Sequence, residues 1–146
     1  STLMRSSAAS DVYKRQQQTA EWNSEKAQQI VQSVIDSGKS FNVIYAENDD
    51  MAKGAVAALD KANIPHGVGK DVIVMGFDCN KWALEELLNQ NWNYDGQCNP
   101  FQASYIDDII KKIENGETIS EKTIIMDEKG FDATTITQED VDNYGI

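Results

Sequence analysis

The segment Val72–Phe77 (VIVMGF) constrains the fold of this chain more than any other stretch of the sequence. It is short, almost wholly apolar and rich in β-branched residues, which indicates a strand buried on both faces, as in a parallel sheet covered by helices. A second short run, Phe41–Ala46 (FNVIYA), is rich in β-branched and aromatic residues and also predicts a strand. The sequence around these strands should therefore supply the covering helices.

Helical patterns alternate with the two strands. Apolar residues recur at the spacing of one buried helix face between a cap at Asn23 or Ser24 and a stop at Gly38. A second helix begins in the polar cluster of residues 47–50 and ends before Pro65, and its small residues allow close packing on a sheet. A third helix is predicted from the apolar residues Trp82, Leu84, Leu87 and Leu88.

The last third of the chain continues this alternation. A weak pattern at residues 92–97 indicates a short strand, and Pro100 suits the start of a helix that Gly116 closes. Another short strand is predicted at Thr123–Met126, before an acidic tail. Alternating helices and strands with short connections predict an α/β fold with a largely parallel sheet flanked by helices. The helix after Pro100 should turn four isoleucines inward: Ile106, Ile109, Ile110 and Ile113.

The composition excludes several classes of function. The formal net charge of -11 argues against nucleic acid and against an anionic membrane surface as partners. No apolar run approaches the ~20 residues of a membrane-spanning helix. His66 is the only histidine, and Cys79 and Cys98 lack metal-site spacing. The two cysteines are expected to be free, buried thiols; a single disulfide between them is the alternative. No glycine-rich nucleotide motif follows a strand, so we expect a non-enzymatic protein without metal or cofactor.

The first residues of the chain, Ser1–Arg15 (STLMRSSAASDVYKR), show neither helical nor strand periodicity. They are similar to translated sequencing-adapter read-through, so we expect residues 1–15 to be a non-native tail; a natural disordered tail is the alternative. An adapter-derived start would mean that the true N-terminus and any export signal lie outside this sequence.

Polar side chains follow both predicted strands. Residues 48–50 (NDD) come after the first strand, and residues 78–80 (DCN) come directly after the second. In open parallel sheets, ligands bind beyond the carboxyl ends of the strands. The sequence therefore predicts a binding site where these two clusters meet.

The segments YAENDDMAKGAVAAL and DVIVMGFD resemble the type 1 periplasmic binding proteins for ribose, galactose and related sugars. The resemblance runs from about Gln18 to Asp132, and the two motifs together are more specific than either alone. The later segment GQCNP, followed by a helix and ENGETI, is similar to the hinge crossing of this family and is reminiscent of galactofuranose-type binders. The resemblance implies two α/β lobes that close over one sugar.

By this resemblance the chain is a C-terminal fragment that completes neither lobe. Residues 16–98 would belong to the C-terminal lobe, residues 99–120 to the hinge crossing and a first-lobe helix, and residues 121–146 to a return strand and an acidic tail. The protein would capture a monosaccharide and deliver it to the permease of an ABC transporter, in the periplasm or another extracytoplasmic space. The alternative is the effector-binding core of a sugar-responsive LacI-type transcription regulator, which shares this fold.

Asp78 is the first candidate for sugar contact. A carboxylate just past a buried strand can accept hydrogen bonds from two adjacent hydroxyls, although the same residue could simply cap a helix. Asn48 offers both a donor and acceptors to hydroxyls, and Asp49 is expected to be the cap of the helix that follows. Trp82 and Trp92 have apolar neighbours and are expected in the core or on the lobe surface.

Two further candidates rest on alignment to the family. Trp22 stands where the family has an aromatic residue that stacks on the sugar ring; the alternative is a hydrophobic staple for its own helix. Gln97 matches a hinge-side amide when the alignment is anchored on the following helix. Anchoring on Pro100 instead shifts the match to Cys98, a poor partner for hydroxyls, and Asn99 is a weaker candidate than Gln97.

Overall fold

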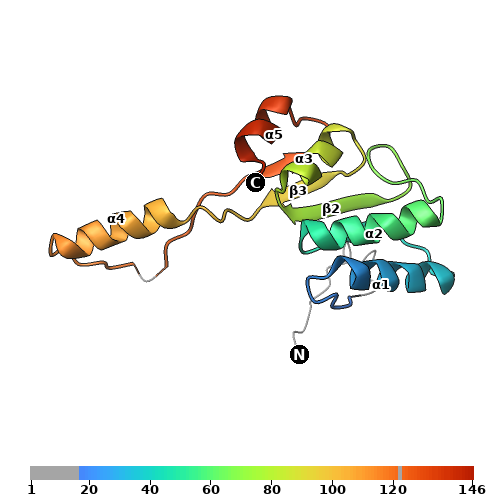
Figure 1. Ribbon diagram of the computed structural model, residues 1–146, viewed down its shortest axis with the longest axis horizontal. Helices are drawn as coiled ribbons and strands as arrows, with labels where there is room; N and C mark the ends of the chain where they lie inside the picture. Colours follow the sequence, from blue (N-terminus) through green and yellow to red (C-terminus); the bar gives the residue numbers. More distant parts are fainter. Residues whose placement is uncertain (1–16, 122) are drawn as a thin grey trace, which may run out of the picture.

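The computed structural model describes residues 17–121 and 123–146, in which helices and strands alternate (Figure 1). The suspected tail, residues 1–15, lies outside these described residues. The elements are, in chain order, α1 (Ser24–Asp36), β1 (Val43–Tyr45), α2 (Asp49–Lys61), β2 (Ile73–Asp78), α3 (Lys81–Leu88), β3 (Tyr94–Gln97), α4 (Ala103–Glu114), β4 (Gly130–Asp132) and α5 (Gln138–Tyr144).

The strands form one four-stranded sheet in the order β1-β2-β3-β4. β1 pairs with β2 in parallel, and so does β2 with β3, with α2 and α3 as the two crossover helices. β4 joins the sheet antiparallel to β3, with Phe131 opposite Asp95. The predicted α/β fold with a largely parallel sheet is confirmed, and the antiparallel strand at one edge is an addition to it.

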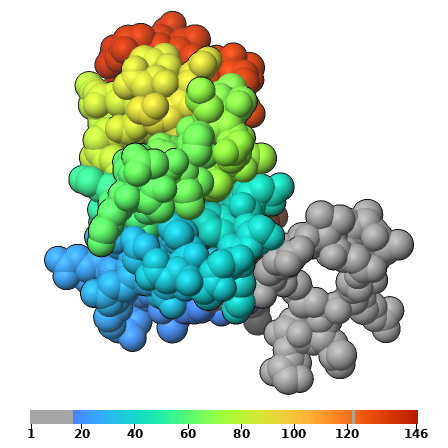
Figure 2. Space-filling model, turned by 90° about the vertical axis from the view of Figure 1, so that its right-hand side faces the viewer, coloured from blue at the N-terminus to red at the C-terminus, as the bar shows by residue number. Residues whose placement is uncertain are grey.

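One face of the sheet is covered by helices. α1 packs along α2, α2 packs on β1 and β2, and α3 packs on β3 and against α5. The close approach of α1 to α2 depends on Gly54, where a Cβ atom would lie 2.0 Å from the carbonyl oxygen of Ser24. Figure 2 shows α1 (blue) and α5 (red) at opposite ends of this body. Large apolar side chains fill the space between helices and sheet, and they are fully or almost fully buried: Leu59, Val74, Leu84, Leu87, Trp92 and Val141.

The opposite face of the sheet is open over β1 and β2. Residues of β2 alternate between buried positions on the helix side and partly exposed positions on the other, where Ile73 is 41% exposed. Tyr45, Phe77 and Tyr94 form a row across three strands, with successive ring centroids 5.2 and 6.4 Å apart. The prediction that Val72–Phe77 is buried on both faces is wrong for the described residues, because helices cover only one of them.

Helix α4 stands away from the sheet (Figure 1), and it begins three residues after Pro100, at Ala103. The prediction that its isoleucines turn inward is wrong: Ile106, Ile110 and Ile113 are 52%, 48% and 58% exposed. The physical reason is that α4 lies too far from the sheet to bury them. The helix keeps an apolar face, as the sequence indicated, but this face meets solvent.

The ends of the elements test the remaining predictions. Asn23 caps α1, because its Oδ1 accepts a hydrogen bond from the Lys26 backbone amide at 2.9 Å. Gly38 and Gly116 follow their helices with left-handed φ values of 70° and 76°, as predicted. The strand predicted at Thr123–Met126 is wrong: these residues have no regular structure, and the last strand forms later, at β4. Among the described residues, no helix has the length and apolarity to cross a bilayer.

Candidate ligand-binding site

The carboxyl ends of β1, β2 and β3 lie at one edge of the sheet. Asp78 at the end of β2 pairs directly with Gln97 at the end of β3. Tyr45 at the end of β1 pairs with Met75, so the segment from residue 46 onward runs beside the end of β2 and reaches Asn48 at the same edge. The structure thus brings three of the four predicted site residues, Asn48, Asp78 and Gln97, to one edge.

Asp78 is partly buried and sits at a sharp change of chain direction. Its φ of 125° and the φ of 60° at Cys79 are both in the left-handed region, which non-glycine residues rarely adopt. Burial raises the pKa of the Asp78 carboxyl above its ordinary value, and the charge of Asp50 adds to this rise, while the backbone amide of Asp49 opposes it. Asp78 therefore offers an acceptor whose conformation is imposed by its surroundings.

Asn48 is half-buried and caps α2, since its Oδ1 accepts a hydrogen bond from the Met51 backbone amide at 2.9 Å. This corrects the prediction that Asp49 is the cap. The backbone of Asn48 is extended just before the helix begins, which is the usual geometry of a cap, whereas Asp49 already lies in the first turn. Only the Nδ2 group of Asn48 remains free of this role, so it can serve as a donor to a ligand.

Asp49 has a different function, which sequence reasoning missed. It is fully buried, and its Oδ2 accepts hydrogen bonds from the backbone amide and the side-chain Nδ2 of Asn80, at 2.9 and 3.0 Å. Asp95 on β3, the only other fully buried charged residue in the part of the chain that the structure describes, accepts a hydrogen bond from the Cys79 amide of the same turn at 3.4 Å. Two buried carboxyl groups therefore hold the turn after β2 through hydrogen bonds to its backbone amides.

Gln97 is half-buried, and its backbone amide and side-chain Oε1 both bond to Lys129, at 2.8 and 3.2 Å. Its Nε2 forms no hydrogen bond among the described residues and is chemically able to donate to a ligand. The Asn99 side chain forms a local hydrogen bond instead, because its Oδ1 accepts from the Phe101 backbone amide at 2.8 Å. Cys98 is exposed. The geometry is consistent with Gln97 as the site residue of this segment.

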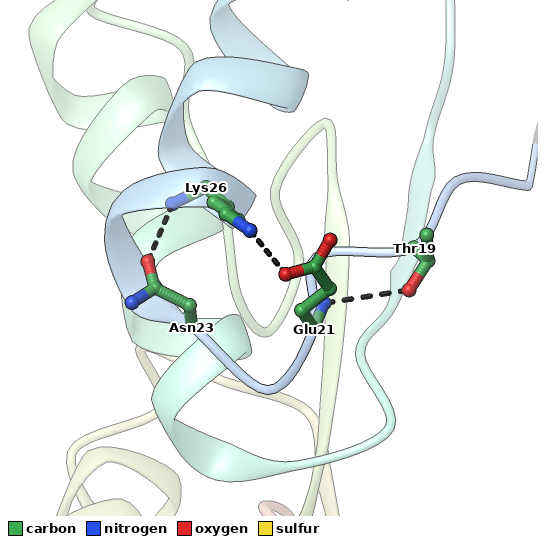
Figure 3. Close-up of polar contacts among 4 residues, drawn as sticks. All are labelled: Thr19, Glu21, Asn23 and Lys26. Atoms are coloured by element: carbon green, nitrogen blue, oxygen red, sulfur yellow. Dashed lines mark hydrogen bonds and ion pairs between the residues drawn. The ribbon is translucent and has the colours of Figure 1, made fainter.

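Trp22 lies in the tight turn before α1 and is 66% exposed, with a left-handed φ of 59°. The turn is held by the contacts that Figure 3 shows: the Glu21 backbone amide bonds to the Thr19 hydroxyl, and the Glu21 side chain pairs with Lys26. Among the described residues, no hydrogen bond or ring contact joins Trp22 to the other three site residues. Its indole is exposed and could stack on a ligand, but the described residues do not enclose it in a site.

The predicted site residues form an open edge rather than a pocket. A shallow hollow of about 460 Å³ lies elsewhere, between α1 and the end of α2, and is lined by Gln28, Gln29, Gln32, Ser33, Asp36 and Lys61. Within the described part of the chain, no group of histidine, cysteine and acidic residues has the arrangement of a metal site. The side chains of Asn48, Asp78 and Gln97 at this edge can form hydrogen bonds to a ligand.

The cysteines and the other tryptophans have structural environments. Cys79 is a buried free thiol, as predicted, but Cys98 is exposed, so the prediction of two buried thiols is half wrong. The reason is that Cys98 follows the end of β3, where the chain leaves the sheet. Trp92 is 1% exposed and packs edge-to-face on Trp82 with ring centroids 5.8 Å apart, which confirms the core placement.

Comparison with known proteins now decides the family. Residues 2–115 match the family described as the periplasmic binding protein domain, which is most of the chain. The chain belongs to the periplasmic binding protein family. The match includes residues of the suspected non-native tail, which lie outside the described part of the structure.

The relatives of this periplasmic binding protein chain are sugar-import proteins. It is 32% identical over 137 residues to a fructose import binding protein of Bifidobacterium longum, covering 92% of this chain and 40% of that one. It is 26% identical over 108 residues to a galactofuranose-binding protein of Escherichia coli, covering 72% of this chain and 33% of that protein. The chain thus spans well under half the length of these relatives.

Solved periplasmic binding proteins share the fold. An ABC transporter solute-binding protein from Actinobacillus succinogenes, solved with bound D-allose, superposes with a TM-score of 0.70 at 26% identity, covering 87% of this chain and 42% of that one. A galactofuranose-binding protein superposes with a TM-score of 0.74 at 24% identity, again over 87% of this chain and 43% of the other. The resemblance to type 1 periplasmic sugar-binding proteins is confirmed, as is the fragmentary extent of the chain.

Proposed function

We propose that this chain is part of the solute-binding component of an ABC importer, which captures a monosaccharide between two lobes and delivers it to a membrane permease. The observation that carries the proposal is the pairing of Asp78 with Gln97, in register, at the carboxyl edge of a sheet where Asn48 also lies. The sugar-import relatives support the same function, and they support an extracytoplasmic location for the complete protein.

At this edge each side chain has a separate task. Ionised Asp78 accepts hydrogen bonds from adjacent sugar hydroxyls, and charge-assisted bonds of this kind are the stronger ones. The free amide groups of Asn48 and Gln97 donate to hydroxyl oxygens. Trp22 covers an apolar face of the sugar ring with its indole, at a small cost in conformational entropy. Closure then follows from contacts that exist only when both lobes meet the ligand.

The path of the chain supports the proposed division into lobes. After β3 the chain leaves the sheet, forms α4 at a distance and returns to β4 (Figure 1). The outgoing and returning segments are joined where they leave the body, since Gln97 bonds to Lys129 and the Asn99 amide bonds to Glu128 at 2.9 Å. We therefore assign residues 16–98 to the C-terminal lobe, residues 99–120 to the crossing and the first lobe, and residues 121–146 to the return and the tail.

A thermal-shift screen of monosaccharides on the complete protein that carries this sequence tests the function. A bound sugar should raise the Tm, because it binds the folded state and not the unfolded one. Asp78→Ala should abolish the shift. The matched control is Asp71→Ala, which removes an exposed carboxylate before β2, at the opposite end of the strand. No shift with any sugar, or an equal shift in the Asp78 variant, would count against the proposal.

The chain of 146 residues by itself should bind monosaccharides weakly or not at all. Its candidate site is an open edge, so half of the enclosing surface and several contacts are missing. Isothermal titration calorimetry with the sugar found in the screen measures this directly. Binding in the micromolar range would show that the edge suffices without a facing lobe, contrary to our expectation.

A further inference from the structure

Two carboxyl groups, Asp49 on α2 and Asp95 on β3, are fully buried behind the candidate site. Neither has a salt-bridge partner among the described residues. Burying a carboxylate without a compensating charge is costly, so buried acids normally pair, accept several hydrogen bonds or keep their proton. The surroundings of this pair show which of these applies.

Each carboxyl group bonds to the turn through one oxygen only. Asp49 Oδ2 accepts from the amide and side chain of Asn80, and Asp95 Oδ1 accepts from the Cys79 amide. The remaining oxygens, Asp49 Oδ1 and Asp95 Oδ2, are buried without a donor. Asp95 lies directly opposite Gly76 in the sheet, and a Cβ atom on Gly76 would lie 2.6 Å from Asp49 Oδ1, so the two carboxyl groups are neighbours on one face. Two ionised carboxylates in this place could only repel each other, because neither carries a donor. One proton between them would satisfy both oxygens.

The charges around the pair favour retention of this proton. Burial raises the pKa of Asp95 to about 9, and the nearby charges of Asp49 and Asp78 act in the same direction. Burial also raises the pKa of Asp49, against the hydrogen bonds from Asn80. Among the described residues, the Cys79 thiol also faces the pair, with its Sγ 3.8 Å from Asp95 Oδ1, and burial raises its pKa so that it stays neutral. Burial therefore favours a pair that retains a proton at neutral pH.

The turn that the pair holds is strained. Asp78 and Cys79 have φ values of 125° and 60°, and such conformations persist only where the surrounding structure imposes them. From the other direction, the backbone of Ile146 bonds to the Cys79 carbonyl at 3.1 Å and accepts from the Lys81 amide at 3.0 Å. The acids are thus the side chains that fix the amides of residues 79 and 80, directly after the proposed ligand-binding carboxylate.

We propose that Asp49 and Asp95 share one proton and act as positioning residues, which hold the strained turn of residues 78–80 so that Asp78 faces the ligand. The role of the pair in orienting Asp78 toward a ligand rests on the proposed function, in which Asp78 binds the sugar. The proton sharing and the holding of the turn concern this chain alone. When the shared proton is lost, two adjacent buried charges repel, and the turn loses its anchor.

The sign of the pH dependence follows from the raised pKa of Asp95. In the unfolded chain this carboxyl titrates near its ordinary value of about 4, and in the folded chain near 9. Between these values the folded state binds one more proton than the unfolded state. The contribution to stability is fully present below about pH 4 and is lost as the pH rises through about 9. The unfolding equilibrium constant should rise by about tenfold per pH unit in this window.

Carboxyl ¹³C NMR titration of the 146-residue chain tests the proposal directly. We expect the Asp95 carboxyl carbon to titrate near pH 9, and the amide protons of Cys79 and Asn80 to shift with the same midpoint. Asp71 serves as the exposed reference carboxyl. An ordinary carboxyl midpoint at both Asp49 and Asp95 would overturn the proposal, because two separately ionised acids share no proton.

Variants separate positioning from simple packing. Asp95→Asn replaces the protonated acid by a neutral donor of the same shape, so it should remove the loss of stability between about pH 4 and 9 and be more stable than the wild type at pH 7. Asp95→Ala should lose stability at every pH and speed hydrogen exchange at the amides of residues 79 and 80. Equal behaviour of the Asn and Ala variants would overturn the proton-sharing role. No sugar is used in these measurements, so their failure is distinct from failure of the proposed function.

Discussion

The two faces of the sheet differ in what covers them, although the same strands build both. On the helix side, Val74 is fully buried against a core that includes Trp92. On the other side, Tyr45 is 61% exposed and packs only on its neighbour Phe77 within the row of rings. An apolar strand sequence therefore does not show by itself whether both faces are buried. That depends on segments elsewhere in the chain, or beyond it.

The comparison predicts that the same kind of substitution has unequal cost on the two faces. The largest difference should come from ring truncation. Trp92→Ala removes a buried indole and should reduce the free energy of unfolding by about 3–5 kcal/mol. Phe77→Ala, on the open face, should cost less than about 1.5 kcal/mol, because its ring is only partly removed from water. Urea denaturation followed by circular dichroism measures both, and equal losses would mean that the open face is also a core.

A second test adds a methyl group to each face. A Cβ atom on Gly76 would lie 2.6 Å from Asp49 Oδ1 and 2.9 Å from the Trp92 ring, both fixed in the core. Gly76→Ala should therefore cost about 1–3 kcal/mol. A Cβ atom on Gly96 would meet the Phe77 ring at 2.5 Å, but this half-buried side chain lies on the face that helices leave uncovered, so Gly96→Ala should cost about 1 kcal/mol or less. The reverse order in thermal melts would contradict the assignment of the faces.

The smallest expected effect concerns the helices that make the covered face. Thr137 and Asp140 form a reciprocal capping box at the start of α5, whose Val141 is fully buried in the core. Thr137→Ala should reduce stability by about 1 kcal/mol, because it leaves the Asp140 amide without its acceptor. Gln138→Ala, in the exposed first turn, should change it by less than about 0.5 kcal/mol. Equal effects in the two variants would show that the cap does not stabilise the helix.

Much of the fold could be predicted from the sequence, because periodicity and caps are local properties. The helix ends at Asn23 and Gly38 and the parallel strands followed from residue type and spacing. The inward turn of the α4 isoleucines could not be predicted correctly, since an apolar stripe shows that a helix has a face to bury but not that a partner lies within reach. The same reason accounts for the open face of β2.

The candidate site was predictable in position but not in detail. The strand-end rule placed Asn48 and Asp78 together at one edge. It could not decide whether Asn48 or Asp49 caps α2, because either side chain can cap and the choice depends on the residue at which the helix begins. Asp95 was missed because the pattern of residues 92–97 is weak even for the short strand it indicated, and nothing local shows that a carboxyl group will be buried.

Gln97 has a double attachment with a mechanical consequence. Its Oε1 accepts a hydrogen bond from the Lys129 amide of the returning segment, and its backbone amide donates to the Lys129 carbonyl. A displacement of the Gln97 amide by a bound sugar would therefore move the outgoing and the returning segment together, because Gln97 is joined directly to both. Bending of the crossing segments would in turn change the direction of the proposed hydrogen bond between Gln97 and the sugar. With the proposed binding role of Gln97, one side chain would contact both the sugar and the returning segment.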